Sequence, residues 1–143
     1  MSELAPAQVR GVLETCLYAE ELEATADFYE QVLGLTPFTR VPGRHVFFRC
    51  GTGVFLLFDP RRTSETGGEV PPHGARGPGH VAFGVRAAEL PLWKDRLAAA
   101  GVEVEAEVTW PSGGTSLYLR DPAGNSVELT TPLIWSIPEE VLG

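Results

Sequence analysis

The chain has 143 residues, of which 43% are hydrophobic and 21% are charged, and its formal net charge is −8. This composition is typical of a globular protein with one core, or of two small modules that share one. The negative charge argues against nucleic acid or an anionic membrane surface as a partner. Residues 1–10 lack the apolar run of a signal peptide, and the longest strongly apolar run, residues 54–58, is far shorter than a membrane span. We therefore expect a cytoplasmic protein in which Cys16 and Cys50 are reduced thiols.

The first half of the chain predicts a strand, a helix and three further strands. After an N-terminal tail at 1–10, alternating side chains predict a strand at 12–18. A period of about 3.6 residues predicts a helix at 21–33 that ends at Gly34. Its buried stripe is expected to consist of Leu22, Ala26, Tyr29 and Leu33. Three strand candidates follow, at 36–41, 45–50 and 54–59, and complete a first module at 11–60.

The second half repeats this order of elements after a linker at 61–78. The linker is rich in glycine, proline and charge. It is long enough either for the two modules of one chain to pair with each other or for two chains to exchange modules. A strand is predicted at 79–85, and a helix at 88–100 that ends at Gly101. The apolar stripe of this helix is Leu90, Trp93, Leu97 and Ala100. Strand candidates at 103–110, 116–120 and 126–131 complete a module at 79–132, and a tail at 133–143 ends the chain.

This internal duplication brings three polar residues to matching positions. Glu14 precedes Gly34 by 20 residues, and His80 precedes Gly101 by 21. When the prolines that follow the last strand of each module are aligned, Glu128 stands opposite Leu56. On the strands that carry Glu14, His80 and Glu128, the opposite face is aliphatic, which suits packing under a helix. Duplication therefore predicts that the three residues belong to one site.

Three segments together resemble the vicinal oxygen chelate superfamily, which includes glyoxalase I, bleomycin-resistance proteins and extradiol dioxygenases. The segments are 22–34, 79–83 and 119–129, the last of which contains Asp121-Pro122-Ala123-Gly124-Asn125. The resemblance implies an α+β, glyoxalase/dioxygenase-like fold, in which paired βαβββ modules form a cupped mixed sheet around a central cavity. In that family a metal is held by residues on the first, fourth, fifth and eighth strands. The matching positions here are Glu14, Leu56, His80 and Glu128.

Leucine cannot bind a metal, so the resemblance implies three protein ligands, Glu14, His80 and Glu128. Two carboxylates neutralise a divalent ion, and three protein ligands leave positions open for substrate, as in catalytic metal sites. Mn, Fe, Zn, Co and Ni all suit this ligand set, so the identity of the metal stays open. Without a metal the two converging carboxylates would repel each other, and one would hold a proton.

Other residues on the same faces are expected to bind a small organic substrate. They are Cys16, Tyr18, Phe47, Arg49, Leu56, Phe58, Tyr118 and Arg120. Arg49 and Arg120 hold equivalent positions in the two modules. Each suits either an anionic oxygen of the substrate or an ion pair with a nearby carboxylate.

The remaining histidines and two tryptophans are weaker candidates for the site. His45 follows a Pro-Gly turn and is expected to line the cavity, whereas His73 lies in the linker and is expected to be solvated. Trp110 and Trp135 are expected to pack in the core rather than close the cavity.

Two functions follow from these residues. The first is a metal-dependent enzyme that binds adjacent oxygens of a small substrate, with Glu14 or Glu128 as the catalytic proton carrier. Lyase, isomerase, transferase and dioxygenase chemistry all remain open, but glyoxalase I activity is not expected because Leu56 replaces the fourth ligand. The alternative is a metal-free protein that sequesters an antibiotic or another small ligand, as bleomycin-resistance proteins do. In both cases we expect a homodimer, with the modules either paired within each chain or exchanged between two.

Overall fold

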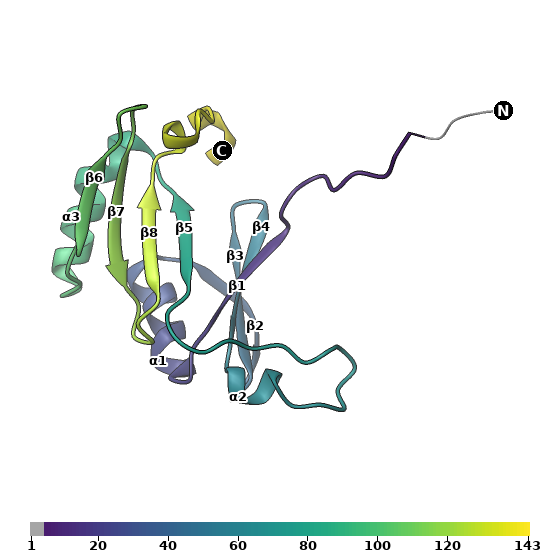
Figure 1. The fold of residues 1–143 in the computed structure, drawn as a ribbon. Coiled ribbons are helices and arrows are strands. Elements are labelled where there is room, and N and C mark those ends of the chain that lie inside the picture. Colours follow the sequence, from purple (N-terminus) through teal and green to yellow (C-terminus); the bar gives the residue numbers. More distant parts are fainter. Residues whose placement is uncertain (1–4) are drawn as a thin grey trace.

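Two four-stranded mixed sheets make up the fold, and each comes from one half of the chain (Figure 1). The computed structural model describes residues 5–143, so the first four residues of the expected N-terminal tail lie outside it. The first sheet has the order β1-β4-β3-β2, with the bounds Glu14–Tyr18, Gly53–Phe58, His45–Cys50 and Thr36–Val41. The second sheet repeats this order as β5-β8-β7-β6, with the bounds His80–Gly84, Ser126–Thr130, Thr115–Arg120 and Ala106–Thr109. The predicted pair of βαβββ modules is confirmed.

The strand registers place Leu56 and Glu128 at equivalent positions. Cys16 pairs with Leu56 between the parallel strands β1 and β4. In the same way, Ala82 pairs with Glu128 between the parallel strands β5 and β8. Since Cys16 follows Glu14 by two residues and Ala82 follows His80 by two, the sheets align Glu14 with His80 and Leu56 with Glu128.

The helix predicted at 21–33 forms as two joined segments, α1 (Leu22–Asp27) and the π-helical η1 (Phe28–Val32). The wider turn is visible in the bond from the Leu33 amide to the Phe28 carbonyl, five residues back, at 3.3 Å. The stripe that faces the core is buried as predicted: Leu22, Ala26, Tyr29 and Leu33. Gly34 ends the helix with a φ of 76°, which glycine adopts without steric cost.

The second helix is less buried than its sequence predicts. It consists of a short 3₁₀ turn, η2 (Ala87–Glu89), followed by α3 (Leu90–Ala99). Of the predicted stripe only Leu97 is fully buried, and Ala100 is exposed. Figure 1 shows α3 behind β6 and β7, at the end of the sheet far from the first module, where fewer elements cover it. No helix in the described part of the chain is long and apolar enough to cross a membrane.

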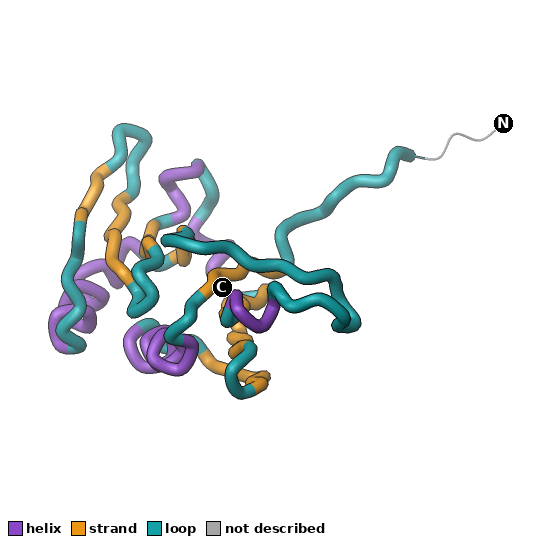
Figure 2. The backbone as a smooth tube through the Cα atoms, turned by 60° about the horizontal axis from the view of Figure 1, so that its bottom comes forward, coloured by secondary structure: helices purple, strands orange, loops and turns teal. Residues whose placement is uncertain are grey.

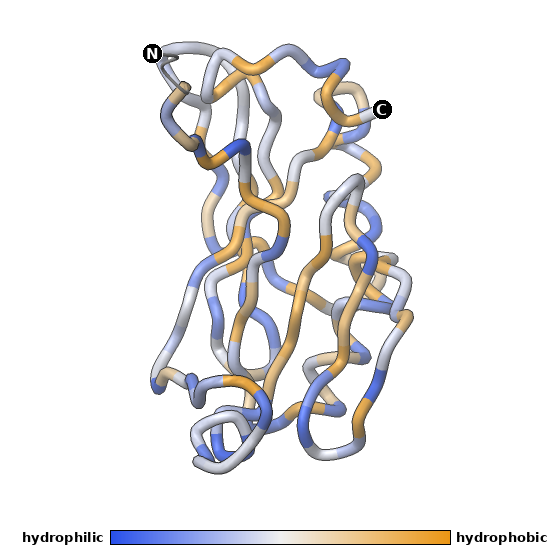
Figure 3. Tube along the Cα trace, turned by 90° about the vertical axis from the view of Figure 1, so that its right-hand side faces the viewer, coloured by the Kyte–Doolittle hydropathy of each residue, from blue (hydrophilic) through white to orange (hydrophobic). Residues whose placement is uncertain are grey.

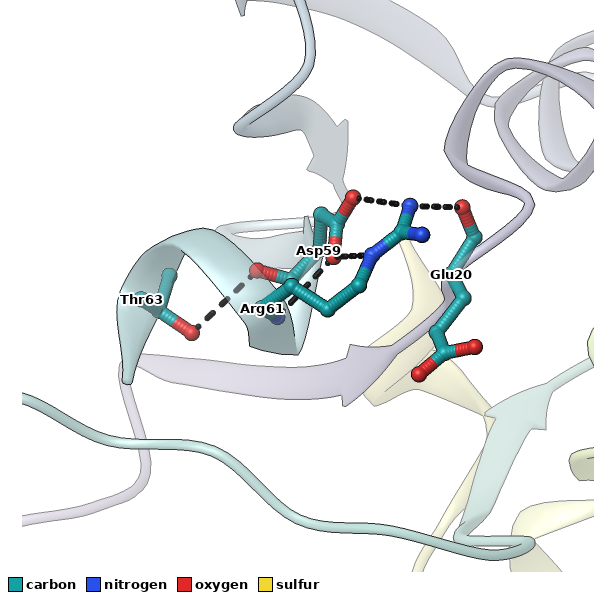
Figure 4. Close-up of polar contacts among 4 residues, drawn as sticks. All are labelled: Glu20, Asp59, Arg61 and Thr63. Atoms are coloured by element: carbon teal, nitrogen blue, oxygen red, sulfur yellow. Dashed lines mark hydrogen bonds and ion pairs between the residues drawn. The ribbon is translucent and has the colours of Figure 1, made fainter. Parts of the chain in front are cut away.

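The loop between the modules begins with a short helix, α2 (Pro60–Thr63), which the sequence pattern does not predict. Asp59 caps it: one carboxylate oxygen accepts the Arg61 amide at 2.9 Å, and the other accepts the Arg61 guanidinium at 2.8 Å (Figure 4). The same guanidinium donates to the carbonyl of Glu20 at 3.1 Å, which ties the end of β4 to the turn after β1. Residues 64–79 continue without helix or strand and belong to the long teal loop of Figure 2.

Replacing Asp59 with alanine is expected to lower the free energy of unfolding by about 1–2 kcal/mol, because the helix cap is lost. Asp59→Asn keeps a capping oxygen and loses only the charge, so we expect a smaller loss. Hydrogen bonds from the Arg61 side chain hold the pKa of Asp59 below its usual value. The charge therefore stabilises the fold above the unfolded-state pKa of about 3.9, and this contribution is lost as the pH falls through the lower pKa of the folded state.

Urea denaturation of wild type, Asp59→Ala and Asp59→Asn at about pH 7 and about pH 3 measures both effects. The difference in the free energy of unfolding between wild type and Asp59→Asn should be smaller at the lower pH. A difference of the same size at both pH values would contradict the assigned role of the carboxylate.

The aliphatic faces of the two sheets meet in one core. Leu17, Phe55 and Leu129 are buried there, and Phe83 packs against the same cluster. Tyr29 lies between the sheets, with its ring centroid 4.7 Å from that of Phe55 and 6.2 Å from that of Phe83. In Figure 3 long extended segments in the middle of the molecule are largely hydrophobic, and hydrophilic segments are frequent where the chain bends at the ends of the molecule. The modules are thus joined through the faces that do not carry the predicted site residues.

A second, polar junction between the modules comes from the turn after β7. Asp121 and Asn125 are both buried, and one oxygen of Asp121 accepts the Tyr29 hydroxyl at 2.6 Å. Asn125 accepts the Gly79 amide at 2.7 Å and donates to the Tyr18 carbonyl at 3.1 Å. Burial raises the pKa of Tyr29, and the nearby charge of Asp121 raises it further. The Tyr29 hydroxyl therefore stays protonated and remains a donor. The Asp-Pro-Ala-Gly-Asn segment therefore acts as a structural clamp on the first module.

Candidate functional site

The predicted site residues lie on the two sheet faces that are turned away from the shared core. On the first sheet this face carries Glu14, Cys16, Tyr18, Phe47, Arg49, Leu56 and Phe58. On the second sheet it carries His80, Ser116, Tyr118, Arg120, Glu128 and Thr130. Their strand neighbours on the other face, such as Leu57 and Val127, are buried in the core. We call these two surfaces the first and second site faces.

His80 and Glu128 form the best-defined pair of the second site face. The Nε2 atom of His80 lies 3.3 Å from Oε1 of Glu128, and Glu128 is only 6% exposed. The other ring nitrogen, Nδ1, lies 3.1 Å from the carbonyl oxygen of Ser126. A carbonyl only accepts, so Nδ1 carries the proton and donates. In the neutral ring Nε2 is then an acceptor that faces a carboxylate, and two acceptors need a proton or a cation between them.

Two further side chains surround Glu128. The Ser116 hydroxyl donates to Oε2 of Glu128 at 2.6 Å, and both residues are buried. Tyr118 stands directly across from Glu128 in the register of β7 and β8, and its ring stacks with that of His80 at a centroid distance of 6.4 Å. Burial raises the pKa of Tyr118, and the Glu128 charge raises it further, so the phenol stays protonated at neutral pH.

Glu14 does not join this pair within one chain. It is exposed on the first site face, and no three His, Cys, Asp or Glu side chains in residues 5–143 lie together as a metal site. The reason is the packing of the modules, because their shared core turns both site faces outward. The chain therefore brings together two of the three predicted ligands.

Aromatic rings and a linker histidine fill part of the first site face. His45 is buried and stacks on Phe47 at a centroid distance of 4.0 Å, and its pKa is lowered by burial and then by the Arg44 guanidinium. The Tyr18 hydroxyl lies 2.6 Å from Nδ1 of His73. The expectation that His73 is merely solvated is therefore wrong, because the linker folds back over this end of the sheet.

The two arginines with equivalent positions make different contacts. Arg120 forms an ion pair with Glu105 at 2.8 Å and also donates to the Gly124 carbonyl at 3.1 Å. Arg49 is exposed, and its guanidinium lies 4.1 Å from the centroid of the Phe38 ring. Arg49 thus has no carboxylate partner within residues 5–143.

The tryptophans also differ from each other. Trp110 is half-buried, and its indole N–H donates to the Ser116 hydroxyl at 2.9 Å. Trp135 is 74% exposed in the 3₁₀ turn η3 (Pro132–Trp135), so its predicted core position is wrong.

Ser116 and Thr130 were not singled out by the sequence pattern, although strand alternation places both on the face of Glu128.

A family model described as Glyoxalase/Bleomycin resistance protein/Dioxygenase superfamily matches residues 11–129. The chain belongs to this superfamily. This confirms the resemblance on which the expected fold rests, since the match extends from the first module into the last strand of the second and includes His80 and Glu128.

Solved structures of the same superfamily are similar over nearly the whole chain. A lactoylglutathione lyase from Agrobacterium tumefaciens is 42% identical, with 92% of this chain and 100% of that chain covered and a TM-score of 0.87. A glyoxalase/bleomycin resistance protein/dioxygenase from Nocardioides is 26% identical, with 88% and 85% covered and a TM-score of 0.70. A glyoxalase-related enzyme from Fulvimarina pelagi is 27% identical, with 86% and 88% covered and a TM-score of 0.68. The comparison with curated proteins gives no match.

Proposed function

We propose that this superfamily member is a metal-dependent enzyme that acts on a small, oxygen-chelating substrate. The observation that carries the proposal is the His80–Glu128 pair, in which two acceptor atoms face each other at 3.3 Å. Two ligand atoms that bind one ion at about 2.1 Å lie about 3.0 to 3.4 Å apart at angles of about 90° to 109°. The separation of the pair therefore matches that of two ligands of one divalent ion, such as Mn²⁺, Fe²⁺, Zn²⁺, Co²⁺ or Ni²⁺.

We propose that a second copy of the chain supplies the third ligand. Glu14 is exposed on a face turned away from the core, so it is free to approach the His80–Glu128 pair of another copy. Val12 and Leu13, directly before Glu14, are 86% and 81% exposed, so apolar side chains beside Glu14 are available for contact with a second chain. A two-fold dimer would thus build two equal sites, each with Glu14 from one subunit and His80 and Glu128 from its partner.

A bound divalent ion would supply Lewis-acid polarisation of a substrate oxygen. His80 and Glu128 would hold it on the second site face, and Glu14 of the partner subunit would complete the set and neutralise its charge. Glu14 or Glu128 would take a proton from the substrate and return it. Tyr118 remains protonated and could donate a hydrogen bond to a substrate oxygen. Leu56 and Phe58 lie on the first site face with Glu14, so in the dimer they would come from the same subunit as Glu14 and pack against the apolar part of the substrate.

The similarity to a lactoylglutathione lyase favours proton-transfer chemistry of the lyase or isomerase type among the open reactions. Metal-free ligand sequestration remains the alternative, and in that case a proton rather than a metal ion would lie between Nε2 of His80 and Oε1 of Glu128. The free thiols Cys16 and Cys50 suit the cytoplasmic location that we propose.

Protein purified without chelator or affinity tag is expected to contain about one divalent ion per chain and to elute as a dimer. A mixed dimer tests whether the site is shared. Glu14→Ala and Glu128→Ala homodimers should both lose their metal. When the two variants are unfolded together and refolded, some dimers contain one subunit of each variant. In such a mixed dimer one site carries both substitutions and the other site carries neither. Metal is therefore expected to return to about half of the sites of the mixed dimer.

Differently tagged copies allow the mixed dimer to be isolated and its metal counted by elemental analysis. No recovery of metal in the mixed dimer would place all ligands within one chain. No metal in wild type would leave ligand sequestration as the better account.

A further inference from the structure

The hydroxyl of Ser116 is the centre of a set of hydrogen bonds that links the carboxylate of Glu128 to Trp110 and Thr130. Ser116 is wholly buried, and its hydroxyl oxygen lies 2.6 Å from Oε2 of Glu128. The same oxygen lies 2.9 Å from the indole nitrogen of Trp110 and 2.8 Å from the hydroxyl of Thr130. Each of these contacts is short enough to be a hydrogen bond.

The direction of every bond follows from the chemistry of the partners. A carboxylate only accepts and an indole N–H only donates, so the Ser116 proton goes to Glu128 and one lone pair accepts from Trp110. The remaining lone pair of Ser116 must accept the Thr130 proton. The hydroxyl of Ser116 is therefore saturated, and it cannot turn away from Glu128 without breaking a buried bond.

The sheet register and a tight turn assemble this set. Ser116 and Thr130 are direct partners between β7 and β8, and Glu128 lies on the same face two residues before Thr130. Trp110 comes from the turn after β6, where its amide bonds the Gly114 carbonyl at 3.0 Å. Gly114 has a φ of 86°, which suits glycine and lets the chain bring the indole back over Ser116.

We propose that Ser116, held by Trp110 and Thr130, is a positioning residue that fixes Glu128 as a metal ligand. With Oε2 bound to Ser116, Oε1 is the oxygen left to face His80 at 3.3 Å. Glu128 is 6% exposed, so water cannot readily replace a lost bond, and the freed carboxylate would be able to rotate. This inference rests on the proposed metal site, and it assigns a role to residues that do not touch the metal.

The test measures Co²⁺ affinity by competition with a chromophoric chelator, and the visible spectrum of the Co²⁺-loaded protein. Ser116→Ala is expected to weaken Co²⁺ binding by about 10- to 100-fold and to change the spectrum. Trp110→Phe and Thr130→Val, which remove one supporting donor each, should have smaller effects in the same direction. Thr130→Ser restores the hydroxyl and should bind Co²⁺ like wild type.

A readout without metal separates this inference from the proposed function. In the metal-free protein, the indole proton resonance of Trp110, assigned with Trp110→Phe, should move upfield and exchange faster with water in Ser116→Ala. If wild type binds Co²⁺ and the Co²⁺ affinity of Ser116→Ala lies within about two-fold of the wild-type affinity, the positioning role alone is overturned. Wild type that binds no Co²⁺ would overturn the proposed function and this role with it. An unchanged indole resonance would show that the bond to Trp110 does not form.

Discussion

Alanine in place of Glu128 is expected to weaken metal retention by about 100-fold or more while the fold is retained. Glu128 supplies one of the three proposed ligands, and its buried carboxylate faces His80. The packing of β8 comes from Val127 and Leu129, which point to the other face and are buried in the shared core. The substitution therefore removes the ligand and leaves the hydrophobic contacts of the strand in place.

Metal content after gel filtration measures retention, and far-UV circular dichroism and thermal melting of the same samples measure the fold. Glu107→Ala is a matched control, because Glu107 is a carboxylate on β6 that pairs with Lys94 at 2.6 Å on the outside of the second module. This control should keep its full metal content. A Glu128→Ala protein that partly unfolds, while its folded fraction keeps all its metal, would assign Glu128 a structural role instead.

The strands were predictable because their side chains alternate and glycine-containing turns separate them. The strands at 36–41 and 45–50 form with the predicted bounds. The strand predicted at 103–110 is shorter, Ala106–Thr109, because β6 pairs with β7 only over these residues. The helix α2 escaped prediction because it lasts only one turn, and its signal is the single pair of Asp59 and Pro60.

For the site, alternation along single strands was enough to place His80 and Glu128 on one face. The separation of Glu14 from them depends on which faces the modules bury together, and aliphatic faces on both sheets do not specify whether they meet within one chain or between two. Ser116 escaped prediction for a similar reason. A serine on a strand gains its role only from the register of β7 against β8 and from the indole that Trp110 brings over it.

A second expected result concerns the methylglyoxal–glutathione adduct on which glyoxalase I acts. We expect the metal-loaded protein to turn it over with kcat/KM below about 10⁴ M⁻¹s⁻¹, the lower end for ordinary enzymes. In four-ligand relatives, a carboxylate or amide at the position of Leu56 completes the metal sphere and helps to move the substrate proton. Leu56 pairs with Cys16 between β1 and β4, just as Glu128 pairs with Ala82 between β5 and β8. Leu56 therefore stands at the position equivalent to Glu128, and its side chain cannot bind a metal. The 42% identity with a lactoylglutathione lyase makes this substrate a direct test of the missing ligand.

Leu56→Glu restores a carboxylate at that position, and Leu56→Met controls for the change in side-chain shape. Leu56 is 8% exposed and lies between Cys16 and Phe47 on the first site face, so a glutamate there would point toward the proposed metal rather than the core. We expect Leu56→Glu to raise kcat/KM for the adduct by about 10-fold or more, as a positioned acid or base does, and Leu56→Met to leave it unchanged. Metal content measured in parallel separates a change in chemistry from a change in loading. Wild-type turnover above the limit, with no gain in Leu56→Glu, would show that a three-ligand site is sufficient for the reaction.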